Sequence, residues 1–350
     1  MKLGIFLPNW VGDVAMATPA VRALRNFFGR QATLVGIMRP YVADVLGGTS
    51  WLDDALFYDP RSGDAALGTW QLVRRLRQER LDAVVLLTNS LRTAMLAWLS
   101  GAPRRVGYAR YGRSLLLTDR LQPPRSAGRL APHAMVDYYL KLAYVLGCPE
   151  ESPRLELATT LADERAANLV WSRLRLPLQR VVAFNCSGAY GAAKLWPPAY
   201  FAELARRVAT QLDHDVLVLC GPSEREVAHE IVRAADNPRV KSLADEPLSI
   251  GLSKASLRRS RLLVTTDSGP RHLAVAFGVP VVGLYGPTLP IWGANPTARE
   301  TALSTALDCL GCAKRTCPLG HHRCMTELSV DDVYRAVAAQ LQPHRELFAA

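Results

Sequence analysis

The sequence is poor in lysine and lacks long apolar runs. Only six of its 42 basic residues are lysine, so arginine supplies almost all of the formal net charge of +11. No run of about 18 uninterrupted apolar residues occurs, which excludes an ordinary membrane-spanning helix. The apolar start, Leu3 to Leu7, is broken by Pro8-Asn9-Trp10, and no small-residue cleavage site follows, so it does not fit a secretory signal peptide. We therefore expect a cytoplasmic protein.

Several motifs that would assign a function are also missing. No Gly-x-Gly-x-x-Gly follows the first predicted strand, residues 3–7, which argues against a nicotinamide oxidoreductase. No nucleophile elbow or obvious Cys/His pair indicates covalent hydrolysis. No nucleic-acid-binding motif or aromatic platform accompanies the arginines, so we expect no nucleic-acid partner. An acidic substrate or an anionic membrane surface fits the charge better.

The chain is long enough for two domains. Its 350 residues are 49% apolar, and apolar runs alternate with amphipathic stretches over nearly the whole length. This alternation is typical of parallel sheets covered by helices, so the predicted fold class is α/β. The predicted strands are residues 3–7, 33–37, 83–88, 181–185, 216–220, 262–266 and 281–285, and the predicted helices are residues 18–28, 66–78, 90–100, 134–146, 198–211, 224–235, 271–277 and 329–342.

A proline-bounded polar stretch, Cys148 to Pro153, separates the two halves and predicts a linker. We place the first domain at residues 1–157 and the second at residues 158–328. Residues 329–350 follow as a C-terminal helix with an N-cap at Ser329, and we expect this helix to pack back toward the N-terminal domain. Ligands of such sheets bind beyond the carboxyl ends of the strands, so the predicted site is a cleft between the domains.

The first glycine turn, Gly12-Asp13, follows a predicted strand and opens a helix. Asp13 has two interpretations. It is either a helix N-cap or a carboxylate that acts as general base toward an alcohol. The unusually apolar Trp10-Val11 before it, and its place at the carboxyl end of a strand, favour the base.

A loop rich in glycine and alanine, residues 186–193, follows the next domain's first strand and ends at Lys194. Small residues such as Gly188 let a backbone approach phosphate oxygens, and an ammonium group neutralises their charge. Because lysine is scarce here, we interpret Lys194 as a phosphate ligand. Glu224, at the head of the helix after residues 216–220, is either a ribose ligand or a favourable charge at a helix N-terminus, and the sequence leaves both open.

The strongest signal is the second glycine turn, Asp267-Ser268-Gly269-Pro270-Arg271-His272, which follows the strand at residues 262–266. The glycine permits close backbone approach, and the proline suits the start of a helix. The imidazole of His272 lies on the first turn, where unpaired N–H groups already favour a phosphate. A purely structural helix start would not need the histidine.

Two clusters of other residues complete the inventory. Arg104, Arg105, Arg110 and Arg113 place four guanidinium groups within ten residues, which suits phosphates or carboxylates. Four cysteines in one short window are candidate ligands of a structural metal, with a redox role or ordinary free thiols as the alternatives. These cysteines are Cys309, Cys312, Cys317 and Cys324.

Taken in order, the motifs resemble those of the ADP-heptose lipopolysaccharide heptosyltransferases, glycosyltransferase family 9, and most closely the type II branch. The resemblance spans nearly the whole chain. It is most specific where the first and second glycine turns occur together at this spacing. The matching motifs are Pro8 to Asp13, Thr88 to Arg92, Tyr111 to Asp119, Ala193 to Pro197, Thr266 to Gly269 with His272, and Leu284 to Thr288.

The resemblance implies a GT-B architecture, with two Rossmann-like domains facing a central cleft. It implies an N-terminal domain that binds the acceptor and a C-terminal domain that binds the nucleotide sugar. The implied enzyme is an inverting glycosyltransferase that moves heptose from ADP-L-glycero-D-manno-heptose to the first heptose of the lipopolysaccharide inner core. No cofactor or metal would be required. The anionic acceptor would be met at the inner face of the cytoplasmic membrane, so a peripheral membrane location is the alternative to a purely cytoplasmic one.

The resemblance also implies residue roles. Asp13 would be the catalytic base, and Lys194 and His272 would meet the negative charge of the leaving diphosphate. The implied donor-binding residues are Ser187, Gly188, Lys194, Glu224, Asp267, Ser268, Gly269 and His272. The expected acceptor-binding residues are Asn89, Arg92, Arg104, Arg105, Arg110 and Arg113.

Two alternatives remain open at this point. One is a type I heptosyltransferase or an enzyme that transfers heptose to another acceptor. The other is a binding protein that senses ADP-heptose without turnover, although such a sensor would not need the Asp13 carboxylate.

Overall fold

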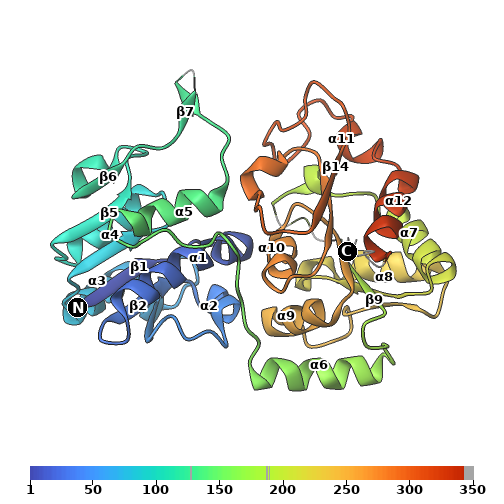
Figure 1. The fold of residues 1–350 in the computed structure, drawn as a ribbon, viewed down its shortest axis with the longest axis horizontal. Helices are drawn as coiled ribbons and strands as arrows, with labels where there is room; N and C mark the ends of the chain where they lie inside the picture. The colour runs from blue at the N-terminus through green and yellow to red at the C-terminus, as the bar shows by residue number, and fades with distance from the viewer. Residues whose placement is uncertain (127, 187, 189, 343–350) are drawn as a thin grey trace, which may run out of the picture. The chain divides into compact units, whose positions relative to one another are not determined.

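The computed structural model describes residues 1–126, 128–186, 188 and 190–342. The chain forms two compact units, which are considered separately below (Figure 1). The first unit comprises Met1–Ala158 together with Ile291–Thr297. The second comprises Thr159–Pro290 and the chain from Ala298 onward. The short segment Ile291–Thr297 joins the first unit by contacts such as that of Trp292, whose ring lies 5.1 Å from the ring of His133.

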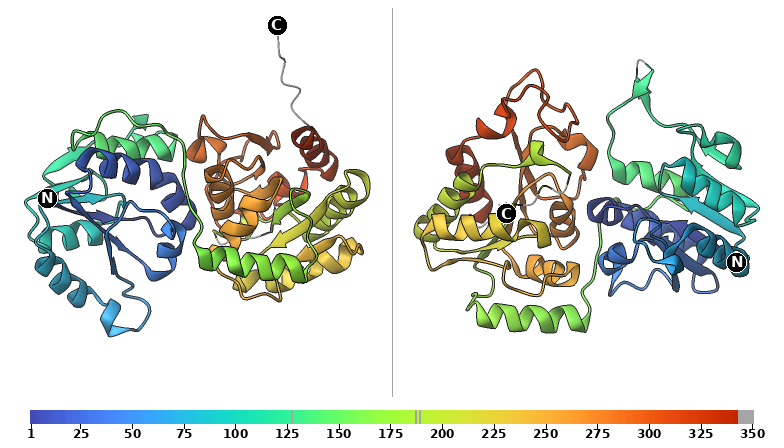
Figure 2. Two further views of the ribbon diagram at one scale, coloured as in Figure 1. Left: turned by 60° about the horizontal axis from the view of Figure 1, so that its bottom comes forward. Right: turned by 180° about the vertical axis from the view of Figure 1, so that it is seen from behind.

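The first unit is built on a parallel sheet whose described strands follow the order β3-β2-β1-β4-β5-β6. Strand β1 lies at its centre, with Ile5 paired to Gly36 on one side and to Val85 on the other. Both faces carry helices (Figure 2), so the central strands are apolar on both sides. The elements are β1 (Lys2–Phe6), α1 (Val11–Phe28), β2 (Thr33–Met38), α2 (Pro40–Leu46), β3 (Asp54–Phe57), η1 (Ala65–Leu67), α3 (Thr69–Glu79), β4 (Ala83–Leu86), α4 (Leu91–Leu99), β5 (Arg104–Tyr108), η2 (Arg113–Leu116), β6 (Asp119–Leu121), β7 (Arg125–Ser126), β8 (Arg129–Leu130) and α5 (Met135–Tyr144).

The second unit repeats this arrangement, with the strand order β11-β10-β9-β12-β13-β14 among its described residues. Every neighbouring pair is parallel, and Phe184 of β9 pairs with Val218 and Val264. Both sheets therefore have the strand order of a Rossmann fold. The elements are α6 (Leu161–Arg173), β9 (Val181–Asn185), η3 (Ala192–Lys194), α7 (Pro198–Gln211), β10 (Asp215–Leu219), η4 (Pro222–Glu224), α8 (Arg225–Ala235), β11 (Val240–Ser242), α9 (Ile250–Arg259), β12 (Leu262–Thr266), α10 (Gly269–Ala276), β13 (Val281–Tyr285), β14 (Glu300–Ser304), α11 (Arg323–Thr326) and α12 (Val330–Leu341). The short helix η5 (Pro290–Gly293) has its first residue in this unit and the others in the first unit.

The last helix forms where the sequence predicted it. Helix α12 begins after Ser329, whose hydroxyl accepts a hydrogen bond from Asp332 N at 3.1 Å, so the predicted N-cap is confirmed. Its buried residues Val333 and Val337 belong to the core of the second unit, and the helix packs on α7. This apolar face is thus covered by the second unit, and the expected packing of the helix toward the N-terminal domain stays a prediction.

The helix that carries Asp13 begins at the glycine turn that was expected to open a helix, ahead of the predicted periodic range 18–28. Helix α1 starts at Val11 instead of residue 18 and continues through Pro19. No helix in the described part of the chain combines the length and apolarity needed to cross a membrane.

Candidate active site

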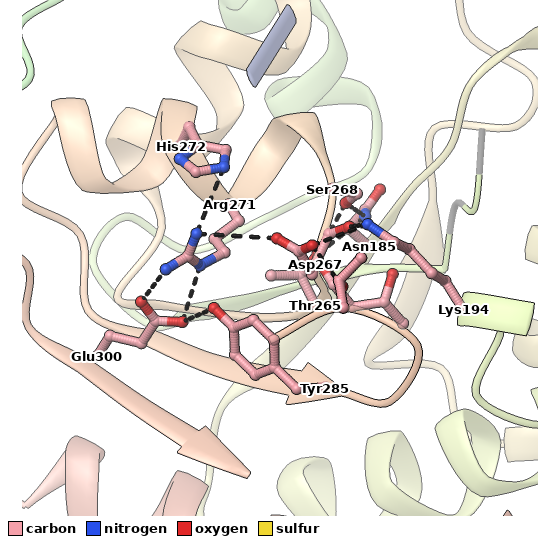
Figure 3. A network of polar contacts seen from close by, with 11 residues as sticks. Asn185, Lys194, Thr265, Asp267, Ser268, Arg271, His272, Tyr285 and Glu300 are labelled. Atoms are coloured by element: carbon pink, nitrogen blue, oxygen red, sulfur yellow. Dashed lines mark hydrogen bonds and ion pairs between the residues drawn. The ribbon is translucent and has the colours of Figure 1, made fainter. Parts of the chain in front are cut away.

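In each unit the loops at the carboxyl ends of the central strands are the expected ligand-binding edge. In the second unit, β9 and β12 are neighbours, and the strand order changes direction between them. The loops that follow these two strands bring Lys194 and Asp267 together (Figure 3). The sequence predicted both residues, but not that they would contact each other.

Lys194 is nearly buried and is held by two oxygens of Asp267. Its Nζ donates to the carbonyl oxygen at 2.6 Å and to the carboxylate Oδ2 at 2.8 Å. The same Oδ2 accepts a 2.6 Å hydrogen bond from the hydroxyl of Thr288. Burial raises the pKa of Asp267, but the charge of Lys194 and these hydrogen bonds outweigh it and hold the pKa below its ordinary value. The carboxylate is therefore ionised and fixes the ammonium group at the end of the sheet.

The start of α10 lies beside this pair. Its N-cap residue is Ser268, and within the described part of the chain the Ser268 side chain makes no capping hydrogen bond to the helix. The Ser268 hydroxyl instead accepts a 2.8 Å hydrogen bond from Nδ2 of Asn185, which also donates to Thr265 at 2.9 Å. Because the serine is engaged elsewhere, the first N–H groups of α10 lack the side-chain cap that Ser268 could supply.

His272 lies on the first turn of α10 and is 5% exposed. Burial, and then the neighbouring charge of Arg271, lower its pKa well below the ordinary value, so the ring is neutral at pH 7. Its Nε2 lies 3.4 Å from Nη1 of Arg271. A guanidinium group only donates, so Nε2 accepts and the ring proton lies on Nδ1. A neutral ring can offer a diphosphate only a hydrogen bond, so the expected diphosphate role of His272 stays a prediction without a positive charge on the ring.

Arg271 is held in turn by Glu300 on the edge strand β14. Its Nε and Nη2 donate to the two carboxylate oxygens at 2.8 and 2.5 Å, and Tyr285 donates to the same carboxylate at 2.7 Å. Figure 3 shows this chain of contacts running from β14 to His272. Sequence reasoning missed Glu300, because the edge strand that carries it was not predicted.

Three other predicted donor-binding residues have local roles or cannot be placed. A Cβ at Gly188 would lie 2.5 Å from the terminal methyl of Leu195, so a larger residue there would displace that side chain. The carboxylate of Glu224 accepts a 2.8 Å hydrogen bond from the N–H of Gly221 and closes the turn before α8. This contact fits the helix-terminus interpretation, and it occupies one of the oxygens that a ribose would use. Ser187 lies outside the described residues.

Asp13 lies in the first turn of α1, in the first unit. The N-cap residue of this helix is Trp10, so Asp13 is not the cap that one interpretation of the sequence required. Its Oδ1 accepts a 3.0 Å hydrogen bond from the hydroxyl of Tyr139 on α5. Burial, and then the charge of Asp13, raise the pKa of Tyr139 well above its ordinary value, so the phenol stays protonated and donates. Tyr139 was missed because periodicity does not show which face of α5 meets α1.

The first unit also contains an open cavity of about 590 Å³ at the carboxyl ends of β1, β2 and β4. Three arginines line it: Arg39 at the start of α2, Arg61 in the loop after β3, and Arg92 in α4. Arg39 lies 3.8 Å from Asp59, whereas Arg61 and Arg92 are exposed. Aromatic side chains form much of the remaining wall. The cavity is lined by Phe6, Leu7, Asn9, Trp10, Ile37, Met38, Arg39, Tyr41, Tyr58, Pro60, Arg61, Thr88, Ser90, Arg92 and Thr93.

Comparison with known proteins decides the family. The sequence profile of glycosyltransferase family 9 (heptosyltransferase) matches residues 69–323, which is more than half of the chain. The chain belongs to glycosyltransferase family 9. It is thus a glycosyltransferase, and the matched region includes Lys194, Asp267 and His272 but begins after Asp13.

Similar proteins span nearly the same length as this family 9 chain. A lipopolysaccharide heptosyltransferase 2 from Salmonella typhimurium is 28% identical over 300 residues, which cover 83% of this chain and 84% of that protein. The structure of the ADP-heptose lipopolysaccharide heptosyltransferase II of E. coli superposes with a TM-score of 0.77 at 23% identity, covering 97% and 98% of the two chains. A family 9 glycosyltransferase from Veillonella parvula superposes with a TM-score of 0.81 at 22% identity over 97% of both chains. These structural neighbours give the fold as GT-B.

The arginine cluster predicted for this family 9 chain is not one patch. Arg104 and Arg105 lie at the amino end of β5, away from the ligand-binding edge. Arg104 pairs with Asp119 at 3.0 Å, and Arg105 donates to carbonyl oxygens of Leu116 and Ala102. The prediction that these two arginines bind the acceptor is therefore corrected. The four arginines are close in sequence but not in space, because strand β5 begins at Arg104 and ends before Arg110.

Arg113 and Asn89 do lie at the carboxyl-end edge of the sheet, but they are hydrogen-bonded to each other. Arg113 is fully buried and donates to the carbonyls of Tyr108 and Thr88 and, at 3.1 Å, to Oδ1 of Asn89. Arg113 is thus a structural residue that fixes the loop after β4. Arg110, whose guanidinium lies over the ring of Tyr111, remains at this edge, and Arg92 lines the cavity described above.

The cysteine window of this enzyme braces the loop that carries Lys194. Arg315 O accepts a 3.0 Å hydrogen bond from Ala193 N, and His322 Nε2 lies 2.9 Å from Ala193 O. Among the described residues, no group of three or more His, Cys, Asp or Glu side chains is placed to hold a metal ion. Three of the candidate cysteines are half-buried and the fourth is buried, all as free thiols: Cys309, Cys312, Cys317 and Cys324.

Proposed function

We propose that this glycosyltransferase is an inverting heptosyltransferase of the type II branch. Its donor would be ADP-L-glycero-D-manno-heptose, and its acceptor the first heptose of the lipopolysaccharide inner core. Family membership and relatives named lipopolysaccharide heptosyltransferase 2 support this choice. The observation that carries the proposal is the position of the Lys194 ammonium beside the uncapped start of α10.

On the donor side, negative charge grows on the leaving diphosphate as the anomeric carbon becomes oxocarbenium-like. Lys194 supplies the positive charge, the N–H groups of α10 supply hydrogen bonds, and Nδ1–H of His272 supplies another. Preorganised donors of this kind are typically worth about 3–4 kcal/mol each. The Asp267 carboxylate holds the ammonium in place before the donor arrives, so little reorganisation is needed.

On the acceptor side, Asp13 acts as general base. The acceptor hydroxyl loses its proton to the Asp13 carboxylate while its oxygen bonds to the anomeric carbon of heptose. The bond from that carbon to the β-phosphate oxygen breaks, and its electron pair leaves with ADP. Tyr139 donates to Asp13 Oδ1 and so orients the carboxylate. The step requires Asp13 and Lys194 to act on opposite sides of one sugar.

The acceptor is anionic, and the arginine-lined cavity of the first unit is our proposed site for it. Arg92, predicted from the sequence, is kept, and Arg61 is added in place of Arg104 and Arg105 as a residue expected to contact phosphate or carboxylate groups of the core. Arg110 stays in the proposed set. The enzyme would meet this acceptor at the inner face of the cytoplasmic membrane.

A transfer assay tests the proposal. The protein is incubated with ADP-heptose and heptosylated core acceptor, with and without a chelator, and the product is followed by mass spectrometry. We expect one heptose to be added, with an inverted anomeric centre by NMR and no loss of rate with chelator. Transfer only to a core without heptose would indicate the type I reaction, and donor binding without product would indicate a sensor. Loss of transfer with chelator would refute the metal-independent mechanism.

A further inference from the structure

Helix α4 presents apolar side chains on its outer face as well as on its inner face. Leu91, Met95 and Trp98 are spaced four and three residues apart and are 45%, 47% and 53% exposed. The fourth exposed residue of the helix is Arg92. The opposite side of α4, with Leu96 and others, fills the core of the first unit. A helix of a water-soluble domain normally turns polar residues outward, so this outer stripe requires an explanation.

The neighbouring elements extend the same surface. Helix α3 has Trp70, Arg74 and Arg77 on one exposed face, with Trp70 78% exposed. Nε of Arg77 donates to the carbonyl of Leu99 at 3.0 Å and joins the ends of the two helices. On the other side of α4, η2 packs against it with Leu115 86% exposed. We name the combined surface the α3–α4 face, and it comprises Trp70, Arg74, Arg77, Leu91, Arg92, Met95, Trp98 and Leu115.

The charge of the α3–α4 face has one sign. None of its residues is acidic, and the chain has no Asp or Glu between Asp82 and Asp119. Exposed tryptophan and leucine flanked by arginine is the composition of helices that lie in the headgroup region of a membrane. A second copy of the chain would place arginines against arginines, so a symmetric self-contact fits this face poorly.

We propose that the α3–α4 face docks the enzyme on an anionic lipid bilayer. The arginines contact the headgroup phosphates, and Trp70, Met95 and Trp98 enter the interfacial region. The cavity of the first unit opens beside this face, because Ser90, Arg92 and Thr93 at the start of α4 line it. Docking therefore presents the cavity to groups that project from the membrane. This consequence rests on the proposed function, whose acceptor carries a lipid.

Vesicle sedimentation tests the docking itself. The full chain is mixed with vesicles of phosphatidylglycerol and phosphatidylcholine, and with vesicles of phosphatidylcholine alone. We expect binding to the anionic vesicles that weakens with salt, and at least about tenfold weaker partition for the double variant Met95→Gln with Trp98→Gln. The charge variant Arg74→Gln should weaken binding to the anionic vesicles only. A matched control, Leu161→Gln with Leu169→Gln, changes two leucines that are 77% and 67% exposed on α6 and should bind like the native chain.

Activity measurements separate this proposal from the proposed function. With a delipidated, water-soluble acceptor the double variant should turn over like the native enzyme. With the acceptor embedded in anionic vesicles its KM should rise at least about tenfold. If the native chain transfers heptose but does not bind the vesicles, the docking proposal is wrong and the transferase proposal stands. If sedimentation velocity shows that the native chain is a dimer and the double variant is a monomer, the face is a self-interface and docking is also refuted.

Discussion

The two units have the same strand order, but they differ in how the N-cap residue of the helix after the fourth strand is hydrogen-bonded. In the first unit this helix is α4, and the hydroxyl of its N-cap residue Ser90 accepts a 3.1 Å hydrogen bond from Thr93 N. In the second unit it is α10, and the N-cap residue Ser268 is turned to Asn185 instead. The side chain of the N-cap residue thus caps α4, whereas among the described residues the side chain of the N-cap residue makes no such bond to α10. The difference comes from one amide, Asn185, on the neighbouring strand.

The charged groups differ in the same way. In the second unit Lys194 is held by Asp267 and Arg271 by Glu300, both in buried pairs. In the first unit Arg61 and Arg92 stand exposed around an open cavity. A rigid, preorganised site suits a diphosphate whose charge develops at one place. Exposed, flexible arginines suit a large acceptor whose anionic groups are spread out.

Replacing the proposed base should produce the largest effect on the first unit. Asp13→Asn keeps the shape and the hydrogen bond from Tyr139 but cannot take a proton, so we expect kcat to fall about 10³-fold. Affinity for ADP should stay unchanged by calorimetry. The control Asp137→Asn removes an exposed carboxylate from α5 and should leave kcat as in the native chain. Transfer that survives Asp13→Asn would remove the base assignment.

Replacing Lys194 should produce the next largest effect, now on the second unit. Lys194→Met removes the proposed diphosphate cation, so we expect kcat/KM to fall about 10²- to 10³-fold. It also takes the nearer cation from the buried Asp267 carboxylate, which keeps Arg271 at 3.8 Å and the hydrogen bond from Thr288, so the free energy of unfolding should fall by about 3 kcal/mol.

A second substitution separates the two consequences. Adding Asp267→Asn to Lys194→Met should recover most of the lost stability but none of the lost activity. Lys241→Met is the matched control, because Lys241 pairs with Asp215 at 3.1 Å in the same unit. Recovery of activity together with stability would mean that Lys194 is only a structural residue.

Much of the fold followed from the alternation of apolar runs, and the reason is physical. Central parallel strands are buried on both faces, so they stand out as continuous apolar segments. The edge strand Glu300–Ser304 is partly exposed along its length, so it shows no continuous apolar run and was missed. The predicted site of the second unit did not include Glu300 for the same reason, because Glu300 lies on this edge strand. For α1 the glycine turn at Gly12 marked the start of the helix, whereas the periodic range 18–28 began too late.

The candidate site was predicted where residues adjacent in sequence remain adjacent in space. Asp267, Ser268 and His272 share one turn, so their meeting needed no knowledge of packing. Arg104 and Arg105 failed because a strand separates them from the ligand-binding edge. Arg39 and Arg61 were not recognised because they come from loops after different strands, which only the sheet order brings together.

Substitutions of arginines in the first unit test whether the cavity or the start of β5 contacts the acceptor. Arg61→Gln and Arg92→Gln should each raise KM for the acceptor about five- to tenfold and leave the KM for ADP-heptose unchanged. Arg104→Gln should instead lower thermal stability through loss of its Asp119 pair, with no change in either KM. A rise in acceptor KM for Arg104→Gln alone would restore the original prediction and remove the cavity as the acceptor site.

Tyr139 is expected to have a smaller, positioning role. Tyr139→Phe removes the donor to Asp13 and should lower kcat about three- to tenfold. Because that hydrogen bond favours the ionised carboxylate, the acidic limb of the kcat/KM profile should also move to higher pH. Tyr144→Phe, on the same helix, should change neither quantity. An unshifted profile with lower kcat would indicate that Tyr139 acts only in packing.

The neutral imidazole of His272 leads to the prediction with the smallest expected effect, a change in the pH dependence of stability. Burial and Arg271 hold the pKa of His272 below its ordinary value in the folded chain, so the unfolded chain binds the extra proton first as pH falls. The free energy of unfolding should therefore decrease below about pH 6.5, by about 1.4 kcal/mol for each pH unit until the folded pKa is reached. Urea titrations at pH 7, 6 and 5 should show a shallower decrease for His272→Gln, whereas the exposed His321→Gln should follow the native chain. Equal slopes for all three proteins would mean that His272 has the same pKa in the folded and the unfolded chain, and the inference of a neutral ring held by burial and Arg271 would then be wrong.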